Sequence, residues 1–310
     1  MQIICCFLQK SSHSRKQRRI ETKNYAYLCM IRANNNMRVK ANCKINLGLH
    51  IVRKREDGYH DLESIMLPVR GLYDILYIEK TEGDAIEFEN EGIAVDCPAD
   101  KNIMVRAARL MQQRYGIGGV KMRLDKRVPF GAGLGGGSSD ATAVILAIND
   151  LYDLKLDKPT LVTLAAELGS DTPFFVHNSA QYCTGRGEIM EDISLSLDGL
   201  WLAVVKPDDA VSTAEAYSGV TPHHPAVNLC DVVKMPIAEW RAKIVNDFEP
   251  NIFEHHPKIA ELKELLYRND ALYASMSGSG SSFYGIFDSE QSEEKVAQLF
   301  PDCFRWSCKL

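Results

Sequence analysis

Five glycines lie within the seven residues from Gly131 to Gly137, and an apolar segment at residues 141–151 follows them. Glycine adopts positive φ at little steric cost, so successive N–H groups of such a loop can converge on an anion. The helix that the apolar segment predicts adds unpaired N–H donors and the positive end of its dipole. The loop therefore predicts a site for nucleotide phosphates, where Ser138 or Ser139 offers a hydroxyl to phosphate or Mg²⁺.

Other glycine-rich loops fit this stretch less well. Gly131, Gly133 and Gly136 match the dinucleotide-binding spacing, but the polar residues 125–129 are a poor end for the buried strand that should precede it. No Gly-Lys-Ser/Thr closes the run, which excludes a Walker A loop. A protein kinase would need a lysine on a strand after the loop and a D-F-G triplet, and neither is present. A flexible linker rarely runs straight into a capped apolar helix.

The hydrophobic pattern predicts a mixed α+β chain. Apolar and polar residues alternate from Arg38 to Leu49 and again at 72–79 and 86–89, so the first third resembles a mostly antiparallel sheet. We expect further strands at 120–124, 200–205, 272–276 and 282–287, and helices at 101–115, 141–151, 160–168, 258–267 and 290–299 with a short one from residue 213. The length favours two domains, which we place at residues 37–193 and 194–310.

The charge is unevenly distributed. Met1–Asn36 carries seven Lys/Arg against the single Glu21, which leaves 29 Lys/Arg against 40 Asp/Glu, a net −11, in the rest of the chain. The apolar residues 3–8 precede the basic cluster at 15–19, the reverse of a secretion signal, so we expect residues 1–36 to be a disordered extension without function. An acidic body argues against wide contact with nucleic acid or anionic lipid.

Two further counts bear on the environment of the protein. The longest apolar runs have six residues, about a third of a membrane-spanning helix, so we expect no membrane span. The nine cysteines are odd in number and show no C-x-x-C pairing, which predicts reduced thiols in the cytoplasm rather than disulfides or a zinc site. Adjacent histidines on a strand point to opposite faces, so His223-His224 and His255-His256 predict no metal site either.

Three separated blocks together resemble one enzyme superfamily: Pro129–Asp140, the lysine segment Ala41–Leu47 and the glycine-serine stretch Ser277–Ser282. The chain resembles the galactokinase, homoserine, mevalonate and phosphomevalonate kinases. Asp57–His60 and Leu168–Phe175 narrow the resemblance to one family within it, the 4-diphosphocytidyl-2-C-methyl-D-erythritol kinases. The likeness runs from Met37 almost to the C-terminus.

The resemblance implies a two-domain α+β small-molecule kinase, with ATP and Mg²⁺ as cofactors and the active site in the cleft between the domains. It also implies transfer of the γ-phosphate to the 2-hydroxyl of the methylerythritol unit, in a monomer or homodimer. The alternatives are a sister kinase for homoserine or mevalonate, a nucleotide-binding protein without catalysis and, more remotely, a dinucleotide-dependent oxidoreductase.

The resemblance also assigns residues. Asp171 becomes the catalytic base and Lys44 its partner, although a turn-capping Asp171 and an exposed strand lysine are alternatives. The acceptor would be read by Asn46, Tyr59, His60, Thr213 and Tyr217, with Tyr59 or Tyr217 stacking on cytosine. The ATP site would comprise Asn102, Ile103, Lys126, Pro129, Gly131, Gly133, Leu134, Gly135, Gly136, Gly137, Ser138, Ser139, Gly278, Gly280 and Ser281. Mg²⁺ would be held largely through ATP, with no metal ligand of the protein's own.

Overall fold

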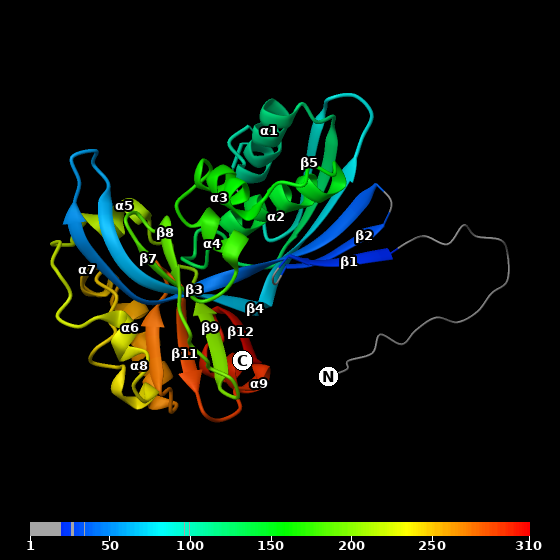
Figure 1. Cartoon of the computed structure of the whole chain (residues 1–310). Helices are drawn as coiled ribbons and strands as arrows, with labels where there is room; N and C mark the ends of the chain where they lie inside the picture. Colours follow the sequence, from blue (N-terminus) through cyan, green and yellow to red (C-terminus); the bar gives the residue numbers. More distant parts are fainter. Residues whose placement is uncertain (1–19, 26–27, 34, 96, 99) are drawn as a thin grey trace.

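The computed structural model describes residues 20–25, 28–33, 35–95, 97–98 and 100–310, which form two sheets with associated helices (Figure 1). The first sheet has eight strands in the order β1-β2-β3-β4-β6-β5, with β7 on β4 and β8 on β7. All its pairs are antiparallel except β5 with β6. Its strands are β1 (Ile20–Tyr25), β2 (Leu28–Ala33), β3 (Asn36–Lys54), β4 (His60–Lys80), β5 (Ile86–Gly92), β6 (Val120–Lys126), β7 (Gln181–Thr184) and β8 (Ile189–Asp192).

Helices α1 (Ile103–Tyr115), α2 (Gly136–Leu151), α3 (Lys158–Ala166) and α4 (Thr172–His177) gather on one side of this sheet (Figure 1). In α2 every residue from Ser139 to Leu151 is buried, as its nearly continuous apolar sequence predicts. Side chains of α1 and α2 form one core with the start of β3 and the end of β4. This arrangement fixes the start of α2, and hence the glycine-rich loop, against the sheet.

The second sheet has the order β10-β11-β9-β12 and is antiparallel throughout. Its strands are β9 (Trp201–Lys206), β10 (Tyr273–Met276), β11 (Phe283–Phe287) and β12 (Phe304–Lys309). Around it lie α5 (Thr213–Ser218), α6 (Leu229–Val232), the 3-10 helix η1 (Ile237–Glu239), α7 (Glu249–His255), α8 (Pro257–Arg268) and α9 (Glu293–Leu299).

The long β3–β4 hairpin joins the two halves of the molecule. Its pairing shifts register at three places, between Asn42 and Cys43, Leu47 and Leu49, and Ile51 and Arg53. Such irregularities bend a strand, and here β3 is buried on both faces from Ala41 to Ile51. Helices cover one part of it, whereas Ile45 and Leu47 share a core with residues of β9 and β11. The polar face that alternation predicted is therefore buried and not solvated.

The structure corrects one expectation and leaves another open. We expected residues 1–36 to be disordered, but β1 and β2 form a hairpin, and β2 pairs with β3 through Met30 opposite Val39. The rest of that segment, residues 1–19, 26–27 and 34, lies outside the described residues. The domain limit at 193 stays a prediction. Within the described chain, no helix combines the length and apolarity needed to cross a membrane.

Candidate active site

The glycine-rich loop lies between β6 and α2. It touches the second lobe, which is the part of the molecule built around the second sheet. Gly131, Gly133 and Gly135 have φ of +63°, +75° and +67°, values that L-residues with side chains rarely adopt. A Cβ on Gly133 would lie 1.9 Å from the carbonyl oxygen of Ser277, so no larger residue fits without moving backbone. The hydroxyl of Ser277 also donates to the Gly133 carbonyl at 2.9 Å. The glycine-rich loop therefore contacts the glycine-serine stretch Ser277–Ser282, the second glycine loop, directly.

A cavity of about 340 Å³ opens beside this loop. It collects ten of the residues predicted for ATP: Asn102, Ile103, Lys126, Pro129, Gly131, Gly133, Gly135, Gly136, Gly137 and Ser138. Asn102 also caps α1, because its Oδ1 accepts from the N–H of Met104 at 2.9 Å. An apolar pocket that ends at a glycine loop and a helix N-terminus can take a flat base at one end and phosphates at the other.

The remaining predicted ATP residues lie outside the cavity lining. Leu134 is buried and its carbonyl accepts from the N–H of Lys44 at 2.9 Å, which ties the loop to β3. Ser139 is also fully buried, so Ser138 is the serine at the cavity wall. Gly278 packs against Gly133, whereas the Ser281 hydroxyl donates to the Asp209 carbonyl at 2.6 Å. Ser277, Gly278 and Gly280 thus all lie close to Gly133, and the contacts of Gly278, Gly280 and Ser281 with ATP stay predictions.

Lys44 and Asp171 come together from β3 and from the residue before α4. The Lys44 Nζ lies 3.2 Å from Asp171 Oδ2, and the side chains are 3% and 34% exposed. Asp171 makes no capping hydrogen bond to α4, so the turn-cap alternative does not describe its side chain. Lys44 is buried, which is not the environment of an ordinary lysine on an exposed strand face. The predicted pairing is present, with its carboxylate open to solvent.

Asn46 supports this pair from within β3. Its Oδ1 accepts from Lys44 Nζ at 2.5 Å, and its Nδ2 donates to the Ser64 hydroxyl at 2.8 Å. Both polar ends of the side chain are thus engaged inside the protein, and Asn46 is only 2% exposed. In this structure Asn46 positions Lys44, and its direct contact with the acceptor stays a prediction.

Lys126 lines the cavity but is already paired with two carboxylates. Its Nζ lies 2.5 Å from Asp74 Oδ2 and 2.9 Å from Asp140 Oδ2, and all three side chains are almost fully buried. Burial lowers the pKa of Lys126, but the charges of Asp140 and Asp74 outweigh it and raise the pKa overall. For Asp140, burial acts in the other direction and raises the pKa to about 8. Its ion pairs tie β4, β6 and α2 together beneath the loop, and the expected contact of Lys126 with the purine stays a prediction.

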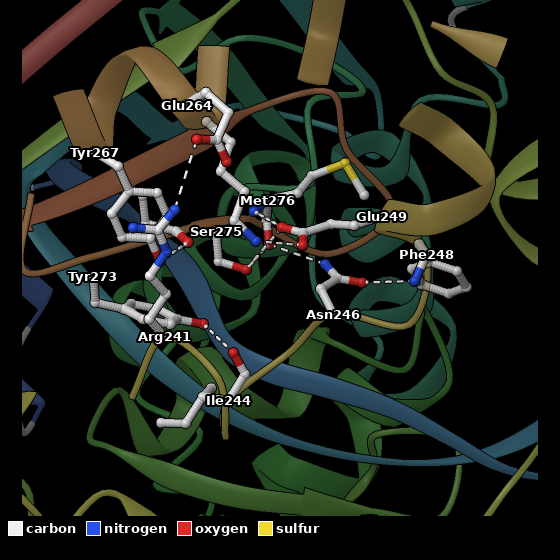
Figure 2. A network of polar contacts seen from close by, with 12 residues as sticks. Arg241, Ile244, Asn246, Phe248, Glu249, Glu264, Tyr267, Tyr273, Ser275 and Met276 are labelled. Carbon is white, nitrogen blue, oxygen red and sulfur yellow. Dashed lines mark hydrogen bonds and ion pairs between the residues drawn. The ribbon is translucent and has the colours of Figure 1, made fainter. Parts of the chain in front are cut away.

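The second glycine loop is held by a polar network that the sequence analysis missed (Figure 2). The Asn246 amide donates to the carbonyls of Met276 and Gly278, both at 2.9 Å, and its Oδ1 accepts from the N–H of Phe248 at 3.0 Å. Glu249 Oε1 accepts from the N–H of Met276 at 2.8 Å. The loop's entry and first turn are therefore fixed by buried side chains from residues 246–249.

We expect Asn246→Leu to lower kcat/KM for ATP by about 10- to 100-fold, because it leaves two buried carbonyls unsatisfied and frees the loop that packs on Gly133. Asn269→Leu is the matched control, since that amide donates only to the Leu265 carbonyl at the end of α8. Steady-state kinetics with ATP varied would compare the two. An equal loss in both variants would show general destabilisation instead of loop positioning.

Among the predicted acceptor residues, Tyr59, His60 and Tyr217 form an aromatic group. The rings of His60 and Tyr217 stack with centroids 4.8 Å apart and planes at 27°. Tyr59 is 56% exposed and carries the Arg186 guanidinium 4.8 Å above its ring. The Thr213 hydroxyl lies 3.4 Å from that of Ser279. Residues from both lobes thus surround one face of the site.

Two pKa shifts describe this aromatic group. Burial, together with the nearby Lys54 charge, lowers the pKa of His60, which favours a neutral imidazole. Burial raises the pKa of Tyr217, and the Asp171 carboxylate adds to the effect. A neutral, partly buried aromatic stack suits a flat base.

Several cavity residues escaped prediction. Phe130 is 51% exposed inside the loop and lines the cavity, and its place between Pro129 and Gly131 was the available signal. Val95 and Cys97 line the cavity too, but nothing in their sequence context marks them. Asp74 and Asn246 act through partners at least 30 residues away, which a sequence pattern does not reveal.

Comparisons with known proteins agree with this geometry. Residues 102–179 match the family model for the GHMP kinases N terminal domain, and residues 234–304 match that for the GHMP kinases C terminal domain. The chain is 44% identical over 271 residues to the 4-diphosphocytidyl-2-C-methyl-D-erythritol kinase of Parabacteroides distasonis, covering 87% of this chain and 98% of the relative.

Solved structures give the same result. A crystal structure of 4-(cytidine 5'-diphospho)-2C-methyl-D-erythritol kinase superposes with a TM-score of 0.75 at 32% identity, covering 87% of this chain and 98% of that chain. Homoserine kinase from Cytophaga hutchinsonii, at 17% identity and a TM-score of 0.63 over 88% and 94% of the two chains, shares the fold. The chain belongs to the 4-diphosphocytidyl-2-C-methyl-D-erythritol kinase family, whose members are ATP-dependent enzymes with the two-domain α+β fold of the GHMP kinases.

Proposed function

We propose that this kinase transfers the γ-phosphate of ATP to the 2-hydroxyl of 4-diphosphocytidyl-2-C-methyl-D-erythritol, giving the 2-phosphate and ADP in non-mevalonate isoprenoid biosynthesis. The observations that support the proposal are the Lys44–Asp171 pair, with Lys44 beside Gly135 of the glycine-rich loop, and the His60–Tyr217 stack. The identity of the substrate is inferred from the names of the relatives given above.

The site supports a simple division of labour. Asp171 would accept the hydrogen bond of the acceptor hydroxyl and take its proton as the phosphoryl group arrives. Lys44 would offset charge on the transferring phosphoryl group, and Asn46 holds the ammonium in place. Backbone N–H groups of the loop and of the α2 N-terminus would bind the remaining phosphates. Phosphoryl transfer through a loose transition state depends mainly on such positioning and neutralisation.

Mg²⁺ fits this site through ATP. Asp140 is the one carboxylate among the described residues that line the cavity, and Lys126 occupies it. Mg²⁺ prefers oxygen ligands and keeps several waters, so the phosphates of ATP and the Ser138 hydroxyl would hold it. When bound, Mg²⁺ would neutralise phosphate charge.

The aromatic group separates this function from its alternatives. Homoserine and mevalonate are small acids without a base to stack, so a sister kinase would have no use for the His60–Tyr217 pair. A binding protein without catalysis would not need the buried Lys44 beside Asp171. Neither alternative is favoured by the named relatives.

An ADP-release assay with ATP, Mg²⁺ and each acceptor in turn tests the assignment. We expect turnover with the cytidylyl substrate and none with homoserine or mevalonate. Turnover with either small acid, and none with the cytidylyl substrate, would overturn the proposed substrate while leaving the kinase family unaffected.

We expect Tyr217→Leu to raise KM for the acceptor by about three- to tenfold, because it removes an aromatic stacking face, and to leave KM for ATP nearly unchanged. Tyr267→Leu serves as control, since that ring lies on α8 and its hydroxyl donates to the Ala274 carbonyl. The same kinetics on Tyr59→Ala would test the second candidate ring. Equal rises in both Michaelis constants would argue against a cytosine contact.

The remaining expectations belong to the same proposal. We propose a cytoplasmic enzyme, monomer or homodimer, that uses small molecules and needs no nucleic acid or membrane. The net −11 of residues 37–310 and the six free cysteines among the described residues support this proposal. Light scattering would measure the mass in solution, and a trimer or larger assembly would contradict it.

A further inference from the structure

Three side chains far apart in the sequence converge beside the end of β3. They are His50 on β3, His223 on the loop after α5, and Asp247 on the loop before α7, and one ligand atom from each lies within 4.8 Å of the others. We propose that these residues form a site for a divalent transition-metal ion such as Zn²⁺, separate from the nucleotide cavity. This reverses the expectation drawn from the spacing of His223 and His224 alone.

The distances suit a tetrahedral ion. The His50 Nδ1 lies 3.2 Å from Asp247 Oδ1, and the His223 Nδ1 lies 3.7 Å from Asp247 Oδ2. An ion about 2.0–2.2 Å from nitrogen and oxygen ligands spaces tetrahedral neighbours roughly 3.3 Å apart. Two imidazoles and a carboxylate are ligands that Zn²⁺ accepts, and a small rotation of His223 would complete the triangle.

The backbone around the site is already fixed. The N–H of His223 donates to the Ile51 carbonyl at 2.9 Å, and the N–H of Ile51 donates to Asp247 Oδ2 at 2.8 Å. Leu49 accepts from the N–H of Asp247 at 2.9 Å. The backbone that carries His223 and Asp247 is therefore held against β3 before any ion arrives, which reduces the ordering cost of binding.

Burial gives the site an inner wall and an open side. The side chains of His50 and Asp247 are 4% and 6% exposed, whereas that of His223 is 54% exposed. His50 Nε2 is buried with no hydrogen-bond partner among the described residues, so Nδ1 is the ring nitrogen that serves the cluster. The fourth position of the ion would be left to water on the side of His223.

The proposed ion would connect the two lobes, since His50 belongs to the first sheet and the other two ligands to the second lobe. Asp247 follows Asn246, which holds the second glycine loop. Bound metal should therefore stabilise this junction.

Titration of the full-length, chelator-treated protein with Co²⁺ tests the proposal, because tetrahedral Co²⁺ gives an intense visible absorption band. We expect this band to saturate at one ion per chain, and Zn²⁺ to displace the Co²⁺ and raise Tm. His223→Ala should weaken binding by at least about tenfold and abolish the rise in Tm, since it removes one of three ligands. His223 is exposed, so the variant should fold.

His224→Ala is the matched control, because His224 is the neighbouring exposed histidine and lies outside the cluster. It should bind Co²⁺ like the unmodified protein. No saturable band, an unchanged band in His223→Ala, or equal losses in both variants would each overturn the proposed site.

Discussion

Asp171→Asn should leave ATP binding within a few fold and lower kcat by about 10²- to 10⁴-fold, the usual contribution of a positioned general base. Asparagine keeps the shape of the side chain and its approach to Lys44, but it cannot take the proton of the acceptor hydroxyl. Rapid-quench measurement of ADP formation in a single turnover would separate this loss from slow product release.

Asp157→Asn is the control for that experiment. Asp157 Oδ1 caps α3 by accepting from the N–H of Thr160 at 3.0 Å, which is the role that an acidic residue before α4 would have as a helix cap. The control should lose a little stability and no turnover. If Asp171→Asn behaves like Asp157→Asn, Asp171 is not the base.

Lys126→Met should lower the free energy of unfolding by about 3–5 kcal/mol, because it leaves Asp74 and Asp140 buried without their shared cation. Urea denaturation at pH 7 measures this change. Lys121→Met, on the same strand, is the control: Lys121 is 38% exposed and pairs with Glu89 at the surface, so its loss should cost less than about 1 kcal/mol.

A second variant separates the structural role of Lys126 from the purine contact that the resemblance implied. Adding Asp140→Asn to Lys126→Met removes one of the two stranded carboxylates and should recover part of the lost stability. A purine contact alone would give a different result: Lys126→Met would keep its full stability and show only a higher KM for ATP.

The elements that could be predicted from the sequence are those formed by contacts between residues close together in the chain. The glycine loop and α2 were predictable because conformational freedom and apolar periodicity are read within about 20 residues. The elements around them also agree, since the helix expected at 101–115 runs from Ile103 to Tyr115. The segment from Ile20 to Ala33 was missed because its apolar and polar residues do not alternate, and its strands form through the pairing of β1 with β2 and of β2 with β3.

The site shows the same limit. The resemblance led to Lys44 and Asp171, and the structure places them together. The resemblance could not show that Lys126 would be paired with buried carboxylates, since Asp74 lies 52 positions earlier in the chain. Burial is the missing information: a lysine beside a nucleotide pocket is a ligand when free and a structural cation when two carboxylates enclose it.

The double burial of β3 also bears on how the molecule comes apart. The same strand gives Val39 to the core under α1 and α2 and gives Ile45 and Leu47 to the core under β9. A fragment that ended at residue 193 would lack the β9 and β11 residues of this core and would expose Ile45 and Leu47 to solvent. The core around Ile45 and Leu47 thus contains residues from both sides of position 193, so a cut there would divide one interior between two pieces.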